Sequence, residues 1–309
     1  MQVTLADDAI RVGEHFQITF QRTLRIPDDG RTYPLPPGLG RFPVYRCGSY
    51  GAKIAAHLQG EDCYFIPMYQ REALWLGFTC TWPPVAVKIA IGGINAISGQ
   101  LDAGSLHSDP QDYVVCPGQL WLDGINSGPA TIRQFVAVPL GSRATVEAAV
   151  TGQEETGGIQ IEVYSPKPGV ELTQPVASPG VRPARQFSPR MGLGAGGRMA
   201  QKIYPDPHGI DAWQETAAAR LFVHIVNSVH FRDITGTDPP PTPIDARTYN
   251  ERGLPWFRLY EEHMGDVAAP EVFAKITPVA DRDREPGDPT DETIDIDPDN
   301  IRPAGEQEL

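Results

Sequence analysis

Three acidic residues border apolar or aromatic segments of the sequence, where burial of a carboxyl group raises its pKa. They are Glu72, Asp112 and Asp123. In many glycosidases, two such carboxyl groups about 5 to 9.5 Å apart in an aromatic cleft hydrolyse the sugar linkage. Two of the acids have a structural alternative, because Glu72 can pair with Arg71 or Arg133 and Asp112 can begin a strand. Hydrolysis of a carbohydrate is therefore one hypothesis for this chain.

Aromatic residues are concentrated between residues 64 and 121. Most are expected in the core, but rings left on a sheet face beside short polar side chains form a platform for a sugar or a protein ligand. The candidate ligand-binding residues are Trp75, Trp82, Tyr113 and Trp121. The sequence alone does not separate a binding platform from a buried core.

Residues 192–197 read GLGAGG and satisfy the pattern G-x-G-x-x-G, which in dinucleotide-binding folds lets bare backbone approach a pyrophosphate. The preceding segment RQFSPR is not a hydrophobic strand, and no βαβ unit with an acidic residue follows, so the context for a dinucleotide is missing. We expect a flexible turn or a tightly packed backbone here. The alternative is a small anion site formed by Gly194, Gly196, Gly197 and Arg198.

His107 and Asp109 are the candidate metal ligands, with Asp112 and Asp123 following in the sequence. Asp109 precedes a proline and so favours a turn, a role that needs only a local hydrogen bond. We therefore expect no metal and no other cofactor. His224 lies in the alternating segment RLFVHIV and is expected to be a hydrogen-bonded structural histidine.

Four cysteines are spaced without a C-x-x-C pair or a nearby histidine that would complete a zinc site. They are Cys47, Cys63, Cys80 and Cys116. We expect reduced, small core residues, and a disulfide or a reactive thiol stays open as the alternative.

The sequence has 309 residues, of which 31 are glycine and 31 are proline, so long helices are not expected. A net charge of −13 makes nucleic acid a poor partner. No apolar run approaches the ~18 residues of a membrane helix, and the first residues lack the pattern of a secretory signal. We therefore expect a globular, cytoplasmic protein without a membrane span or a nucleic-acid partner.

Short segments rich in valine, isoleucine and aromatic residues alternate with glycine, proline, asparagine and aspartate. This pattern predicts a mainly β protein, with an antiparallel β-sandwich or barrel-like core. The expected strands cover residues 16–26, 64–69, 73–78, 86–91, 112–116, 131–140, 145–150, 158–164 and 220–226. Short helices are expected within residues 49–58, from 242 to 252 and from 255 to 263.

Changes in composition divide the chain into four sections. Residues 1–165 form the expected β-rich core, and the six prolines of residues 166–190 indicate a loop or linker. Residues 191–280 are expected to be an α+β section packed on that core. Residues 281–309 are strongly acidic and lack aromatic residues, which is typical of a disordered tail.

A series of segments is distinctive: PMYQREALWLGF, AVKIAIGGINAISG, DPQDYVVCPGQLWLDG, RQFVAVPLG, VTGQEETGGIQIEVY, MGLGAGGRMAQKIYPDPHGIDAWQ and PPPTPIDARTYNERGLPWFRLY. Over residues 16–265 the chain resembles an uncharacterised family of actinobacteria and other bacteria, with related domains in fungi that sometimes follow ubiquitin-like modules. Some bacterial members are labelled integral membrane proteins, a label that the absence of a spanning segment argues against. The resemblance implies no activity and no site residue, and it marks residues 166–190 and 270–309 as variable connections.

These observations favour a non-enzymatic binding or self-assembling β-sandwich protein. Extended proline-rich segments can cover the sheet edge of a neighbour, so a homo-oligomer or larger assembly is expected. A protein or a carbohydrate is the expected ligand class. The alternative is a hydrolase or carbohydrate-active protein that uses the paired carboxyl groups.

Overall fold

The computed structural model describes residues 1–172, 191–238 and 266–279, except residues 34, 37, 55–59, 61 and 103. The helices expected over residues 242–252 and 255–263, the acidic tail and most of the proline-rich linker lie outside these residues.

The protein is mainly β, as the spacing of apolar segments predicts. The strands are β1 (Val3–Ala6), β2 (Ala9–Val12), β3 (Phe16–Thr23), β4 (Thr32–Tyr33), β5 (Gly38–Arg41), β6 (Tyr45–Arg46), β7 (Cys63–Pro67), β8 (Ala73–Cys80), β9 (Val85–Ile91), β10 (Ile94–Asn95), β11 (Tyr113–Cys116), β12 (Trp121–Leu122), β13 (Gly124–Gly128), β14 (Thr131–Pro139), β15 (Ile159–Tyr164), β16 (Met191–Ala200) and β17 (Ala219–Val226).

The ladders arrange these strands in two layers. In the first layer β1, β2, β3 and β8 are consecutive neighbours, and β12 and β14 pair with successive parts of the far edge of β8. β16 follows β14, and β5, β13 and β4 extend the layer at β3, β14 and β16. In the second layer the order is β6, β7, β17, β15, β9 and β11, with β10 beside β9. Two pairings are parallel, β4 with β16 and β7 with β17, and the rest are antiparallel. The layers join where Met191 pairs with Ile225.

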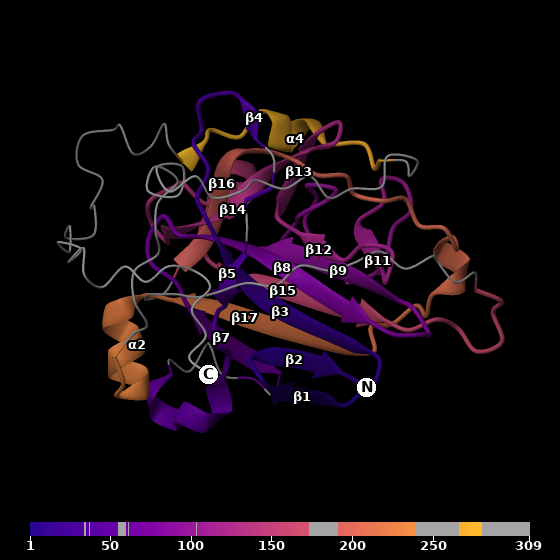
Figure 1. Ribbon diagram of the computed structural model, residues 1–309, viewed down its shortest axis with the longest axis horizontal. Coiled ribbons are helices and arrows are strands. Elements are labelled where there is room, and N and C mark those ends of the chain that lie inside the picture. The colour runs from indigo at the N-terminus through magenta and orange to yellow at the C-terminus, as the bar shows by residue number, and fades with distance from the viewer. Residues whose placement is uncertain are drawn as a thin grey trace, which may run out of the picture.

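Alternation along each strand builds the core between the layers. The even-numbered residues of β3 from Phe16 to Phe20 and the odd-numbered residues of β9 from Val85 to Ile91 belong to one buried cluster. Strand side chains point to opposite faces in turn, so the intervening residues lie on the two outer faces. Figure 1 shows β3, β8, β15 and β17 crossing the middle of the molecule. Residues after the linker therefore supply strands to both layers.

Short helices lie at the margins of the sheets. They are η1 (Cys47–Lys53), α1 (Val146–Thr151), η3 (Ile210–Ala212), α2 (Ser228–Thr235) and α4 (Glu271–Ala274). In Figure 1, α2 lies beside the η1 segment at one end of the molecule, and α4 lies by β13 at the other. Among the described residues, none of these helices is long and apolar enough to cross a membrane.

The strand expected over residues 145–150 is wrong, because this segment forms α1. The Thr145 hydroxyl accepts a hydrogen bond from the backbone N–H of Ala148, which caps the first turn. Gly152 adopts a left-handed conformation with φ of 78° and ends the helix. Two end signals, a threonine cap and a terminating glycine, outweigh the β-propensity of the two valines.

The glycine-rich segment expected to be a flexible turn is strand β16. A Cβ at Gly196 would lie 2.5 Å from Val136 Cγ2, and one at Gly197 would lie 2.5 Å from the carbonyl oxygen of Pro27. At Gly194 it would lie 2.6 Å from Val279 Cγ2. The glycines therefore serve close packing, which was the other half of that expectation. Arg198 is exposed at the end of the strand, and an anion site here stays a prediction without a supporting contact.

Candidate functional site

The outer face of the first layer carries two of the predicted ligand-binding tryptophans. Gln21 of β3 pairs with Trp75 of β8, and in the next row Thr19 pairs with Gly77. On the other side of β8, Trp121 of β12 pairs with Gly77 and Leu122 with Leu76. Asp123 is the next residue after this ladder and lies on the same edge of β8 as Trp121. We call this set the tryptophan face: Thr19, Gln21, Trp75, Gly77, Trp121 and Asp123.

Gly77 makes the tryptophan face possible. A Cβ at this position would lie 2.7 Å from Thr19 Oγ1 and 3.2 Å from Cζ3 of the Trp75 ring. The neighbouring side chains therefore lean over the glycine and close the gap that it leaves. Trp75 is buried and Trp121 is half-buried, so the Trp121 side is the more accessible end of the face.

Two buried acceptors on the tryptophan face have no hydrogen-bond partner among the described residues: Gln21 Oε1 and Asp123 Oδ2. Their side chains belong to residues that are only 4% and 3% exposed. The Gln21 amide donates to Thr19 Oγ1 over 2.5 Å, which leaves its carbonyl oxygen unused. Because buried polar atoms are nearly always paired, two orphan acceptors beside two indole rings are unusual.

The electrostatics of Asp123 follow from its burial. Loss of hydration raises the pKa of its carboxyl group from the ordinary 3.8 to about 7, although a side-chain hydrogen bond with Trp121 opposes the shift. The backbone N–H of Asp123 donates to Gln201 Oε1 over 3.0 Å, which fixes the chain at this point. Asp123 is thus a positioned carboxyl group whose protonation changes near neutral pH.

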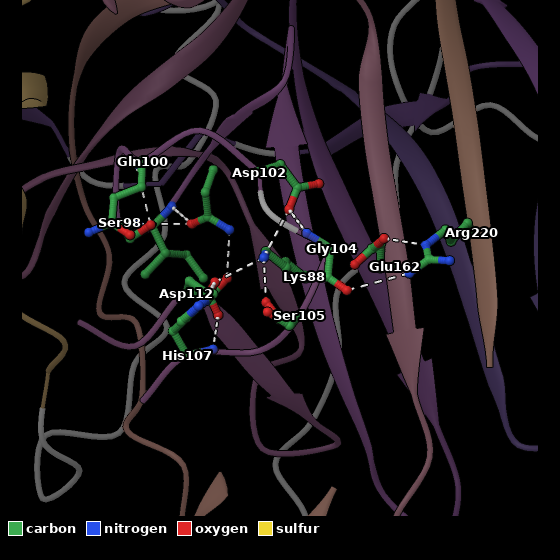
Figure 2. A network of polar contacts seen from close by, with 12 residues as sticks. Lys88, Ser98, Gln100, Asp102, Gly104, Ser105, His107, Asp112, Glu162 and Arg220 are labelled. Atoms are coloured by element: carbon green, nitrogen blue, oxygen red, sulfur yellow. Dashed lines mark hydrogen bonds and ion pairs between the residues drawn. The ribbon is translucent and has the colours of Figure 1, made fainter. Parts of the chain in front are cut away.

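The second predicted acid, Asp112, lies on the outer face of the other layer and is fully engaged. Figure 2 shows the Lys88 ammonium enclosed by three acceptors. It lies 2.9 Å from Asp102 Oδ1, 3.0 Å from Asp112 Oδ2 and 2.6 Å from the carbonyl oxygen of Ser105. His107 donates its backbone N–H to Asp112 Oδ1, and its ring Nδ1 lies 2.9 Å from Asp112 Oδ2. We call Lys88, Asp102, Ser105, His107 and Asp112 the lysine network.

The lysine network attaches the loop between β10 and β11 to the sheet. Asn95 donates to the carbonyl oxygen of Asp112 and accepts from the backbone N–H groups of Ile97 and Ser98. One row across the second layer then runs from Tyr113 through Lys88 and Glu162 to Arg220. Glu162 is held there by an ion pair with Arg220 (Figure 2). Each charge in this row has a partner, so the network stabilises a loop.

The third predicted acid, Glu72, faces the interior between the layers. Its carboxylate pairs with the buried guanidinium of Arg22. Burial raises the pKa of Glu72 well above its ordinary value, and the charge and hydrogen bond of Arg22 oppose that rise. Glu72 thus lies between the layers, whereas Asp112 and Asp123 lie on the two opposite outer faces, and the arrangement does not place two of the three acids in one cleft.

The other predicted site residues have separate locations. Tyr113 is fully buried and donates its hydroxyl to Asp206 Oδ2, so it belongs to the packing beneath the loops. Trp82 is 37% exposed between β8 and β9. His107 and Asp109 are exposed, and His107 is held by Asp112. Tyr113 and Trp82 therefore do not join the tryptophan face.

Two sets of residues were missed at the sequence level. Gln21 lies in the alternating strand β3, and its position beside Trp75 depends on the sheet register. Cys47, Cys63 and His224 come together although the sequence separates them widely. Within the part of the chain that the structure describes, they are the one group of three potential metal-ligand residues whose atoms all lie within 4.8 Å. The available signal was the alternation of side chains along the two strands, which places Cys63 and His224 at outward-facing positions.

Comparison with protein-family models, with curated proteins and with solved structures finds no match for this chain. The resemblance of residues 16–265 to the actinobacterial family therefore stays a prediction.

Proposed function

We propose that the protein is a non-enzymatic binding protein whose tryptophan face takes a polyhydroxylated ligand of the saccharide class. The observation that carries this proposal is a pair of buried acceptors that have no partner within the described part of the chain: Gln21 Oε1, opposite Trp75, and Asp123 Oδ2, near Trp121. A saccharide supplies what these groups lack, because it is rich in hydroxyl donors.

The two rings fit the other half of such a ligand. A sugar ring has an apolar C–H face, which packs on an aromatic ring while its hydroxyl groups turn toward polar neighbours. Gln21 lies opposite Trp75 on β3, and Asp123 follows β12 on the other edge of β8, so hydroxyl groups can be held on both edges of this strand. The half-buried Trp121 offers the first contact.

Binding is favoured over hydrolysis by the position of the acids. Hydrolysis requires two carboxyl groups across the scissile bond. The tryptophan face holds Asp123, whereas Glu72 is ion-paired between the layers and Asp112 is engaged by Lys88 on the other outer face. A single carboxyl group with a pKa near 7 serves as a hydrogen-bonding group for a neutral ligand.

The test is saccharide binding by the full chain and its Trp121→Ala variant, measured by titration calorimetry against a panel of neutral mono- and oligosaccharides. We expect at least one saccharide to bind in the millimolar range or tighter, and Trp121→Ala to weaken that binding about tenfold or more, since an aromatic stacking partner is lost. Trp82→Ala removes a tryptophan away from the face and is the matched control.

Absence of binding across the panel at millimolar concentration overturns the proposal. Equal loss of binding in the Trp82→Ala variant also overturns it, because the response then does not depend on this face. Self-association of the chain stays a separate prediction, which light scattering tests.

A further inference from the structure

Three reactive side chains lie together on the outer face of the second layer. Cys47 begins η1, Cys63 begins β7, and His224 lies on β17, and all three are buried. The two sulfur atoms are 2.9 Å apart. All ligand atoms of the three residues lie within 4.8 Å of one another.

Strand register explains why the cysteines meet. Tyr45 pairs with Phe65 and Arg46 with Tyr64 in the antiparallel ladder of β6 and β7. The next pair in this register is Cys47 with Cys63, so the two side chains stand opposite each other on the same face. On the other side of β7, Phe222 of β17 pairs with Cys63, and His224 follows two residues later on the same face.

An aromatic shell surrounds the thiols. Tyr45 stacks on Phe65 with ring centroids 5.1 Å apart, and Phe231 of α2 meets Tyr45 edge-on at 5.4 Å. Ile54, Val226 and Ile234 belong to the same small apolar cluster. The shell limits the contact of the thiols with water, so the charge state of the thiols depends mainly on their immediate neighbours.

Those neighbours polarise the pair. The thiol of Cys47 stabilises a thiolate on Cys63, and the His224 imidazole adds to this effect against the cost of burial, so the pKa of Cys63 is lowered. The same contact and burial raise the pKa of Cys47. Cys63, which lies beside His224, is therefore the more readily ionised of the two thiols and the better nucleophile.

We propose that Cys47 and Cys63 form a reversible redox pair, in which a small hydroperoxide oxidises Cys63 and Cys47 resolves the product to a disulfide. The thiolate of Cys63 attacks one peroxide oxygen; an S–O bond forms, the O–O bond breaks, and the leaving oxyanion takes a proton from solvent. The sulfur of Cys47 then attacks the sulfenic sulfur; an S–S bond forms, the S–O bond breaks, and hydroxide leaves with the Cys47 proton as water. The two thiols lose two electrons and the peroxide gains them.

The distance between the sulfur atoms favours this chemistry over metal binding. In a tetrahedral zinc site with Zn–S bonds of about 2.3 Å, two sulfur ligands are separated by roughly 3.8 Å. At 2.9 Å the sulfurs already lie well inside that separation. The described residues also provide three ligands here, whereas structural zinc sites close with four.

The test is mass spectrometry of the full chain after treatment with stoichiometric hydrogen peroxide and alkylation under denaturing conditions. We expect two of the four thiols to become protected, a loss of two hydrogen atoms from the intact mass, and a single cross-linked peptide that contains Cys47 and Cys63. Dithiothreitol should restore four alkylated thiols. Because this readout uses the unmodified chain, it does not depend on a variant that folds.

Variants sharpen the assignment. Cys47→Ser should leave a sulfenic acid on Cys63 that dimedone traps. Cys80→Ser changes a half-buried cysteine outside the pair and is the matched control, which should form the same disulfide as the unmodified chain. His224→Gln should slow oxidation by about tenfold or more and shift the pH profile of alkylation of Cys63 upward, which a purely structural change would not do.

Three results would overturn the proposal: four free thiols after peroxide, a cross-link that involves Cys80 or Cys116, or about one zinc ion per chain that protects both thiols in the untreated protein. The last result would assign the cluster to a metal instead. The proposal uses none of the residues of the tryptophan face, so a negative saccharide titration leaves it standing.

Discussion

The tryptophan face and the lysine network lie on opposite outer faces of the sandwich and differ in how their buried polar atoms are paired. The lysine network balances one ammonium group against the carboxylates of Asp102 and Asp112 and a backbone carbonyl. On the tryptophan face, Gln21 Oε1 and Asp123 Oδ2 have no donor among the described residues. Burial of a charged residue therefore does not mark a site by itself. The balance of donors and acceptors separates a structural network from a surface that can accept a ligand.

The largest effect is expected from Lys88→Met, which removes the donor at the centre of the lysine network. Asp102 and Asp112 then lose their common cation while Asp112 stays buried, so the free energy of unfolding should fall by about 3–5 kcal/mol. Urea denaturation of the purified variant at neutral pH measures this loss. Arg11→Ala breaks an exposed ion pair with Asp7 and is the control, with little expected change. A small loss for Lys88→Met would mean that the network is not what attaches the loop.

A second prediction uses the pKa of Asp123, which is raised from 3.8 to about 7 by burial. The folded state then holds the proton more tightly than the unfolded state, so this group's contribution falls as the pH rises from about 4 through 7. The change amounts to about 4 kcal/mol at most, since one pKa unit corresponds to about 1.4 kcal/mol. Asp123→Asn removes this dependence. The free energy of unfolding of the Asp123→Asn variant minus that of the unmodified chain should therefore increase between pH 4 and pH 8.

The same measurements of the free energy of unfolding can also contradict this prediction. If both proteins show the same pH dependence of the free energy of unfolding, Asp123 titrates as it does in the unfolded chain. Its burial would then be relieved in solution, and the contrast between the two outer faces would weaken.

The smallest effect is expected from Gln21→Met, a substitution of similar shape on the tryptophan face. It removes the hydrogen bond from the Gln21 amide to Thr19, and it also removes an unpaired carbonyl oxygen. These changes oppose each other, so the free energy of unfolding should change by about 1 kcal/mol or less. Saccharide binding should weaken in the same variant. A loss as large as that of Lys88→Met would show that Gln21 is structural.

Much of the β architecture was predictable because it depends on local alternation. The strands around residues 16–23, 73–80, 85–91 and 159–164 follow apolar periodicity of two, and their boundaries lie close to those expected. The helix α1 and the strand β16 were not recovered. In α1 the cap and the terminating glycine decide the structure, and in β16 the glycines are fixed by neighbours that are distant in sequence.

The candidate site was only partly predictable for a related reason. Trp75, Trp121 and Asp123 stood out by residue type, but the sequence could not show that they share a face or that Gln21 joins them, since this depends on the register of three strands. Asp112 and Glu72 matched the same chemical criterion and proved to be engaged by Lys88 and Arg22. Residue type selects candidates, and the long-range pairing of strands decides among them.

The parallel pairing of β7 with β17 has a consequence for biosynthesis. Cys63–Pro67 must wait for Ala219–Val226, which follow about 150 residues later in the chain. At roughly 5–20 residues per second, a ribosome needs on the order of 10–30 s to make this stretch. During that interval Phe65 and Cys63 are without their neighbouring strand on this side. Until the second layer closes, this edge of β7 therefore offers unpaired backbone groups to other strands.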